Sequence, residues 1–169
     1  SFSGASNIIV RHMRFRMGHG GSSGKDCAGI ASGHDMIFDH CSFSWGLDET
    51  FSINSNGAGS SHHITISNSI MSQGLQPHSA GGLMQDPAIT LYRNLYADNK
   101  TRNNKIKTVN QYTNNIVYNW NAAAYNMGGD SEGDSYCNIE SNLFISGPSG
   151  GKSPFTGGNS NFHCYGDDN

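Results

Sequence analysis

Apolar and polar residues alternate along six segments of the chain, which recur at intervals of 21–28 residues. The segments span 7–18, 35–46, 63–74, 88–99, 109–120 and 136–147. In each segment, alternating apolar residues are followed by a short polar break and then by a second apolar run. Alternation with a period of two is typical of strands that bury one face. The pattern therefore predicts a repeated pair of short strands.

A third short apolar run lies between most of these segments, at 27–31, 50–53, 81–84 and 122–127. Three strands in each repeat are typical of a β-solenoid coil, whereas a propeller blade needs about 40–45 residues. We therefore predict an all-β fold, a right-handed parallel β-helix with three strands per coil, as a single domain over 1–169. Coils bury their apolar faces only against neighbours, so a complete solenoid needs caps at both ends. Neither end shows a capping pattern, and we expect a fragment or trimmed core that lacks one or both caps.

One polar position inside the repeat is occupied by asparagine in three segments, at Asn94, Asn115 and Asn142. Equivalent residues of stacked coils lie about 4.8 Å apart. Stacked amide side chains at that spacing form hydrogen-bonded ladders. The sequence therefore predicts that these three side chains form one ladder.

Charge and composition exclude several partners. Only 14% of the residues are charged and the net charge is −3, with no extended basic cluster. These values argue against nucleic acid or an anionic membrane as a partner. No apolar stretch reaches about 18 residues, so the sequence predicts no membrane span.

The cysteine spacings fit no zinc pattern of the CxxC type. Cys137 and Cys164 are 27 residues apart, about one coil, so they could stack at disulfide distance. Cys27 and Cys41 are interpreted as buried thiols, with disulfides left open. His62 and His63 are adjacent, so on a regular strand they point to opposite faces and cannot chelate a metal together.

Charged residues collect in the turns that precede the third strand of each coil. From the first coil to the fourth, these turns and strand starts carry Asp26, then Asp48 and Glu49, then His78, then Arg102, Lys105 and Lys107. Equivalent positions on successive coils form a column. The acidic end suits a hard cation such as Ca²⁺, and the basic end suits an anionic polymer. The alternative is a solvated edge, because polar residues line the turns of every solenoid.

The stretches 26–50, 63–75, 94–105 and 114–120 resemble pectate lyases of polysaccharide lyase family 1. The most specific parts are IFDH at 37–40, similar to the family's WIDH, and TRNNK at 101–105, similar to its RxPxR. The resemblance extends over most of the chain. It implies a right-handed parallel β-helix and Ca²⁺-dependent β-elimination on polygalacturonate.

The resemblance also implies a metal site. Asp26 and Asp48 match calcium ligands of the family. A third acidic ligand of the family falls on Ser52 here, so the site is either weaker than usual or completed by Glu49. The implied metal set is therefore Asp26, Asp48, Glu49 and Ser52.

The resemblance further implies catalytic and substrate-binding roles. Arg102 matches the arginine that acts as Brønsted base. Lys105 and Lys107 match arginines that bind substrate carboxylates, and His78 matches a substrate-binding lysine. Asp39 and the following histidine match a family pair outside the cleft, which we interpret as structural.

Together these observations predict a secreted, extracellular and monomeric enzyme that binds Ca²⁺ and cleaves de-esterified pectin. Two alternatives stay open. One is a lyase for another uronate-containing polysaccharide, because three binding positions differ from the family pattern. The other is a carbohydrate-binding β-helix without turnover, which the retention of Arg102 disfavours.

Overall fold

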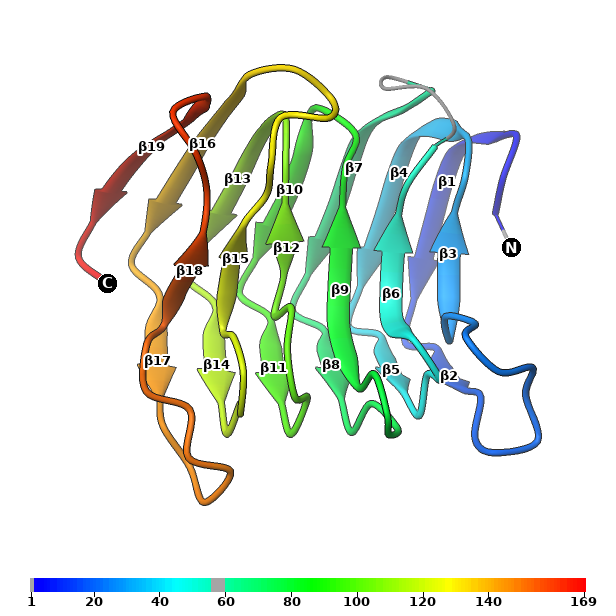
Figure 1. The fold of residues 1–169 in the computed structure, drawn as a ribbon. Coiled ribbons are helices and arrows are strands. Elements are labelled where there is room, and N and C mark those ends of the chain that lie inside the picture. Colours follow the sequence, from blue (N-terminus) through cyan, green and yellow to red (C-terminus); the bar gives the residue numbers. More distant parts are fainter. Residues whose placement is uncertain (1, 56–59) are drawn as a thin grey trace.

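The computed structural model describes residues 2–55 and 60–169, which form a solenoid of parallel strands (Figure 1). Its 19 strands belong to three sheets that run along the solenoid. The predicted parallel β-helix with three strands per coil is confirmed. No helix occurs among the described residues, so none of them forms a helix that could cross a membrane.

Each coil contributes one strand to each sheet. Sheet A contains β1 (Ala5–Arg11), β4 (Gly33–Asp39), β7 (Ser61–Ser67), β10 (Ile89–Tyr92), β13 (Val109–Thr113), β16 (Ser135–Glu140) and β19 (Phe162–Asp167). Sheet B contains β2 (Arg14–Arg16), β5 (Ser42–Ser44), β8 (Ile70–Ser72), β11 (Leu95–Ala97), β14 (Ile116–Tyr118) and β17 (Leu143–Ile145). Sheet C contains β3 (Ala28–Ile30), β6 (Glu49–Ile53), β9 (Ala80–Met84), β12 (Lys105–Ile106), β15 (Tyr125–Met127) and β18 (Phe155–Gly157).

The core fills the space between the three sheets with stacked apolar side chains. Alternate residues of β4, β7 and β10 point inward and are buried, as the period-two pattern predicts. Phe43 stacks on Phe15 of the preceding coil, with ring centroids 4.8 Å apart. It also stacks on Phe51 of its own coil at 4.7 Å. Packing along the axis and across the coil therefore holds neighbouring coils together.

The corner between sheets A and B is a tight turn at a residue in the left-handed backbone region. The φ angle is 53° at His40, 55° at Arg93 and 57° at Asn114. From Ser69 to Asn142, the residue that follows is buried, and its side-chain oxygen accepts a hydrogen bond from the equivalent backbone N–H of the coil before it. The left-handed residue recurs at this corner in each coil, from His12 to Asp168, and it is polar each time.

The asparagine ladder forms at this corner as predicted. The Asn142 side-chain oxygen accepts a hydrogen bond from the Asn115 side chain at 3.1 Å, and the Asn115 oxygen accepts one from the Asn94 backbone N–H at 2.9 Å. The ladder is longer than the sequence indicated. Ser69 occupies the same position one coil earlier, and the Asn169 side-chain oxygen accepts a bond from the Asn142 side chain at 2.8 Å.

Two further sequence features have a structural explanation. Asn99 belongs to the sequence Asn-Lys-Thr, but its side chain is buried and bonds to the Met71 carbonyl and the Gly74 N–H, so it is not accessible to a glycan. Cys137 and Cys164 are partners in the register of β16 and β19, as their spacing indicated, and both are free thiols.

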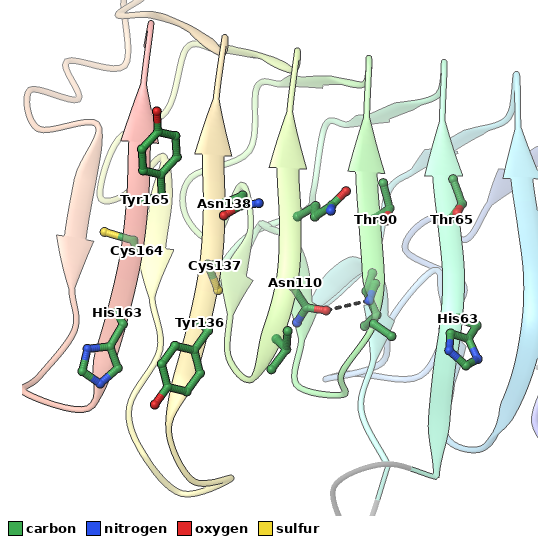
Figure 2. Close-up of a pocket in the computed structure, with 14 residues that line it drawn as sticks. His63, Thr65, Thr90, Asn110, Tyr136, Cys137, Asn138, His163, Cys164 and Tyr165 are labelled. Atoms are coloured by element: carbon green, nitrogen blue, oxygen red, sulfur yellow. Dashed lines mark hydrogen bonds between the residues drawn. The ribbon is translucent and has the colours of Figure 1, made fainter.

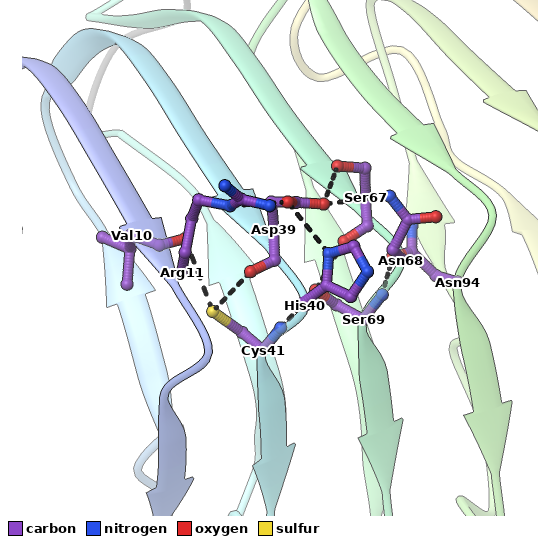
Figure 3. Close-up of polar contacts among 9 residues, drawn as sticks. All are labelled: Val10, Arg11, Asp39, His40, Cys41, Ser67, Asn68, Ser69 and Asn94. Carbon is purple, nitrogen blue, oxygen red and sulfur yellow. Dashed lines mark hydrogen bonds and ion pairs between the residues drawn. The ribbon is translucent and has the colours of Figure 1, made fainter.

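Asp39 is the centre of a polar network on the outside of the sheet A corner (Figure 3). Its carboxylate accepts hydrogen bonds from Arg11, Ser67 and Asn68, at 2.9–3.0 Å, and pairs with His40 at 2.9 Å. These contacts join three successive coils. They support the structural interpretation of Asp39 and His40.

Candidate functional site

The acidic residues of the predicted column lie together at one end of sheet C. Asp26 is in the turn before β3, Asp48 is in the turn before β6, and Glu49 is the first residue of β6. One carboxylate oxygen from each lies within 4.8 Å of the other two. Parallel stacking explains this convergence, because each turn is placed directly beside the turn of the next coil.

Hydrogen bonds fix the orientation of the Asp26 carboxylate. Its Oδ1 accepts a bond from the Glu49 backbone N–H at 3.1 Å, and its Oδ2 accepts one from the Ser52 hydroxyl. Ser52 stands on β6 beside Gly29 of β3, where a side chain would crowd its Oγ at 3.2 Å. Ser52 therefore contacts the acidic cluster through Asp26. We define the acidic cluster as Asp26, Asp48 and Glu49.

Glu49 is the buried member of the acidic cluster. It is 3% exposed, and its carboxylate forms an ion pair with Arg102. Burial raises the pKa of Glu49 to about 7, and the neighbouring carboxylates act in the same direction. The Arg102 guanidinium opposes this shift but does not cancel it. Additional positive charge near Glu49 would therefore stabilise its ionised form.

His78 and Arg102, from the next two coils, each contact a carboxylate of the acidic cluster. His78 precedes β9, and its Nδ1 lies 2.8 Å from Asp48 Oδ1. Arg102 precedes β12, and its side chain is 37% exposed. Each of these side chains therefore combines contact with a carboxylate and access to solvent.

The two lysines of the predicted site differ in exposure. Lys105, the first residue of β12, is partly buried, and its pKa is lowered by burial and by the nearby positive charges of Arg102 and Lys107. Lys107 is only 6% exposed, and its ammonium group donates a hydrogen bond to Ser131. The structure therefore places Lys105 near Arg102, and places the end of Lys107 against the 131 turn.

The backbone around Arg102 is held closely by its neighbours. Gly82 N–H donates a hydrogen bond to the Arg102 carbonyl at 2.7 Å. A Cβ atom on Gly81 would lie 2.8 Å from the same carbonyl, and one on Gly82 would collide with the Asn104 side chain. Two adjacent glycines on β9 thus allow the turn carrying Arg102 to approach β9. Sequence reasoning identified neither glycine as part of the site, although the pair Gly-Gly inside a strand is a signal for close backbone approach.

A separate hollow lies on the outer face of sheet A, away from the candidate site (Figure 2). His63, Tyr136, His163 and Tyr165 are among the side chains that line it. Tyr136 and His163 stack on each other with centroids 4.9 Å apart, so their inner ring faces cover each other. None of the residues predicted for metal or substrate binding lines this hollow.

Comparisons with known proteins identify relatives along the whole chain. It is 59% identical over 170 residues to a protein named probable pectate lyase C from Neosartorya fischeri, an alignment that covers 100% of this chain and 40% of the relative. It is 60% identical over 166 residues to a protein of the same name from Aspergillus fumigatus, covering 98% of this chain and 39% of the relative. A third, from Emericella nidulans, is 55% identical over 170 residues. The chain thus spans about two fifths of the length of these curated relatives. No protein-family model matches it.

Proposed function

Since this chain belongs to the pectate lyase family, we propose that the protein cleaves de-esterified pectin by calcium-assisted β-elimination. The substrate class follows the names of the relatives. The observation that carries the mechanism is the contact between the acidic cluster and Arg102, because it combines a cation site with a strong positive side chain.

The acidic cluster fits Ca²⁺ by its donor chemistry. Ca²⁺ takes six to eight oxygen ligands, preferably carboxylates, and completes its shell with water or substrate. Three carboxylates that already converge would supply part of such a shell. Glu49 would supply the third carboxylate, because Ser52 stands where the family has an acidic ligand. Ser52 orients Asp26 instead. Bound Ca²⁺ supplies positive charge that neutralises the substrate carboxylate beside it.

Elimination breaks the C5–H bond and the C4–O4 bond of a uronate and forms a C4–C5 double bond. The C5 proton lies next to the carboxylate, and its removal places negative charge on that group. Positive charge at the carboxylate stabilises the transition state. A base accepts the proton, and the departing O4 takes a proton from water.

Arg102 is the residue to which we assign the base role. A guanidinium is normally charged, and the Arg102 guanidinium is held by its ion pair with Glu49. When Glu49 serves as a metal ligand, its hold on Arg102 weakens. Lys105 lies near Arg102 and adds a second positive charge that can face the substrate carboxylate. Glu49 therefore couples cation binding to the state of Arg102.

Substrate carboxylates would be bound by His78, on the coil before Arg102, and by Lys105, three residues after Arg102 on the same coil. We assign Lys107 an indirect role in binding because its ammonium group is buried against Ser131. A polymeric substrate outside the cell also requires secretion, and the relatives are fungal proteins. We therefore propose an extracellular monomer with no nucleic acid or membrane partner.

Ultraviolet absorbance of the unsaturated product tests the proposal directly. Polygalacturonate is incubated with the protein in excess Ca²⁺ and, in parallel, in excess chelator. We expect product only in Ca²⁺, and less from highly esterified pectin, whose carboxylates are masked. Equal turnover in chelator would remove the calcium role, and no product from any uronate polymer would remove the lyase activity.

A further inference from the structure

We propose that His62, His63 and Asp35, supported by His34, bind a divalent transition-metal ion such as Zn²⁺ on the outer face of sheet A. We call these four residues the histidine cluster. It lies on β4 and β7, whereas the acidic cluster lies at the edge of sheet C. The proposal is therefore independent of the lyase function.

The backbone explains how two adjacent histidines face each other. His63 has a φ angle of 52°, in the left-handed region, and Asp35 has a φ angle of 55° at the same place in β4. Both residues are skipped in the pairing of the strands, in which His34 pairs with His62 and Met36 with Ile64. The left-handed residue at this place in each strand breaks the alternation of side chains. The expectation that His62 and His63 point apart is therefore wrong.

The ligand atoms of the cluster lie at distances that a metal could bridge. His63 Nδ1 is 3.0 Å from His62 Nδ1 and 3.7 Å from Asp35 Oδ1. Zn²⁺ bound tetrahedrally at 2.0–2.1 Å holds two nitrogen ligands about 3.3 Å apart. The two imidazoles thus stand close to the separation that a shared Zn²⁺ requires.

His34 holds the other members in place. Its Nδ1 lies 2.8 Å from Asp35 Oδ2, which leaves Asp35 Oδ1 available on the side of His63. Its ring stacks on His62, with centroids 5.0 Å apart and an interplanar angle of 8°. An outer histidine that bonds to a ligating carboxylate is typical of metal sites, where such partners orient the ligands.

Closing the site needs one side-chain rotation. Among the described residues, only the acidic cluster brings three ligand atoms all within 4.8 Å of one another. His62 or Asp35 must therefore swing toward the other to complete the triad around His63. The side chains of Asp35 and His63 are 50% and 66% exposed, and exposed side chains change rotamer on a fast timescale. Water would complete the coordination.

The donor set selects the kind of metal. Two imidazole nitrogens and one carboxylate oxygen suit Zn²⁺, Cu²⁺ or Ni²⁺, whereas Ca²⁺ prefers oxygen ligands throughout. The two proposed sites should therefore bind different ions. Zn²⁺ at the histidine cluster would link β4 to β7, and so join two coils at the surface.

Calorimetric titration of the purified, tag-free protein with Zn²⁺ at pH 7.5, in excess Ca²⁺, tests the proposal. We expect one Zn²⁺ per chain and a higher melting temperature in Zn²⁺, because a ligand that binds only the folded state stabilises it. His62→Gln and His63→Gln should each weaken binding at least about tenfold, and His34→Gln should weaken it less.

Matched variants distinguish the histidine cluster from Zn²⁺ binding elsewhere on the chain. His163→Gln removes an exposed imidazole from the same sheet face, and Asp48→Asn alters the acidic cluster. Both should keep Zn²⁺ binding. The proposal is overturned if Zn²⁺ does not bind, if His62→Gln and His63→Gln bind it like the unaltered protein, or if Asp48→Asn abolishes binding. Each variant's melting temperature without Zn²⁺ shows that it is folded.

Discussion

Arg102 forms an ion pair with Glu49, which precedes it by 53 residues in the sequence. Strand β9 lies between β6, which begins at Glu49, and β12, which follows Arg102, so the pair reaches across a whole coil. The contact makes the proposed base and a proposed metal ligand direct neighbours. A change at either residue should therefore affect both cation dependence and turnover.

Replacement of Arg102 distinguishes a base from a substrate clamp. Arg102→Lys keeps a positive charge but loses the planar guanidinium and its reach. If Arg102 is the base, both Arg102→Lys and Arg102→Ala should lower kcat by about 10²–10⁴-fold, the usual contribution of a general base. Steady-state kinetics on polygalacturonate measure this loss. A lysine variant with near-normal kcat and a raised KM would identify Arg102 as a clamp. Arg93→Lys, at an exposed corner, is the matched control.

Removal of one acidic ligand should change the calcium requirement. Asp26→Asn and Asp48→Asn should each raise the Ca²⁺ concentration for half-maximal activity at least about tenfold, because ligand charge sets affinity at such sites. Ser52→Ala should have a smaller effect, since Ser52 acts through the orientation of Asp26. Calcium titrations of initial rate measure both. The exposed Asp134→Asn should behave like the unaltered protein, and an unchanged calcium requirement in Asp26→Asn would argue against the assignment.

The asparagine ladder predicts a large loss of stability at its centre. Asn115→Ala removes the donor to the Leu91 carbonyl at 3.0 Å and the acceptor for the Asn94 N–H. Each buried group left without a partner costs about 1–3 kcal/mol, so we expect the free energy of unfolding to fall by about 3 kcal/mol. Urea denaturation measures it. Asn138→Ala, on the exposed outer face of β16, should change stability by less than about 0.5 kcal/mol.

The polar network at Asp39 predicts a pH-dependent contribution to stability. Hydrogen bonds from Asn68 and His40 hold the pKa of the Asp39 carboxyl well below its ordinary value. The contribution is therefore complete above the unfolded-state pKa of about 3.9 and is lost as pH falls below it toward the folded-state value. Asp39→Asn should cost about 1–2 kcal/mol at pH 7, where the lost bonds involve a charged group.

Urea denaturation at pH 7 and pH 3 checks this dependence. The difference in stability between Asp39→Asn and the unaltered protein should be smaller at pH 3. At that pH the unfolded state binds a proton at Asp39 and the folded state does not, so the unfolded state of the unaltered protein is stabilised. Asp98→Asn is the control, since Asp98 is a corner carboxylate with a 2.7 Å bond from Asn119. A difference that stays constant with pH would show that the Asp39 charge contributes nothing.

The repeat explains why the sequence predicted so much of the fold. Alternation identified the strands of sheet A, and the repeated asparagines identified the ladder. Both inferences work because residues one repeat apart in the sequence are neighbours in stacked coils. The same reasoning placed Asp26 beside Asp48. It could not extend the ladder through Ser69, since serine there has no asparagine-like signal.

The remaining features depend on backbone geometry and side-chain reach. The left-handed φ at His63 reverses the direction expected from strand alternation, and no common turn residue marks it. The ion pair of Glu49 with Arg102 joins residues two coils apart. Stacking of equivalent positions predicts only contacts between adjacent coils, so it did not reveal this pair. Lys107 looked equivalent to Lys105, but its packing against the turn at Ser131 separates the two.

The stacking of coils also has a consequence for how the protein unfolds. Every ladder bond described above joins residues 21–27 positions apart, so the sequence distance between partners does not grow with the length of the solenoid. The entropy of closing each coil is therefore similar from one end to the other. Opening should therefore spread as a front from coil to coil, and Asn115→Ala should make that front cross the coils joined by Asn115 more easily.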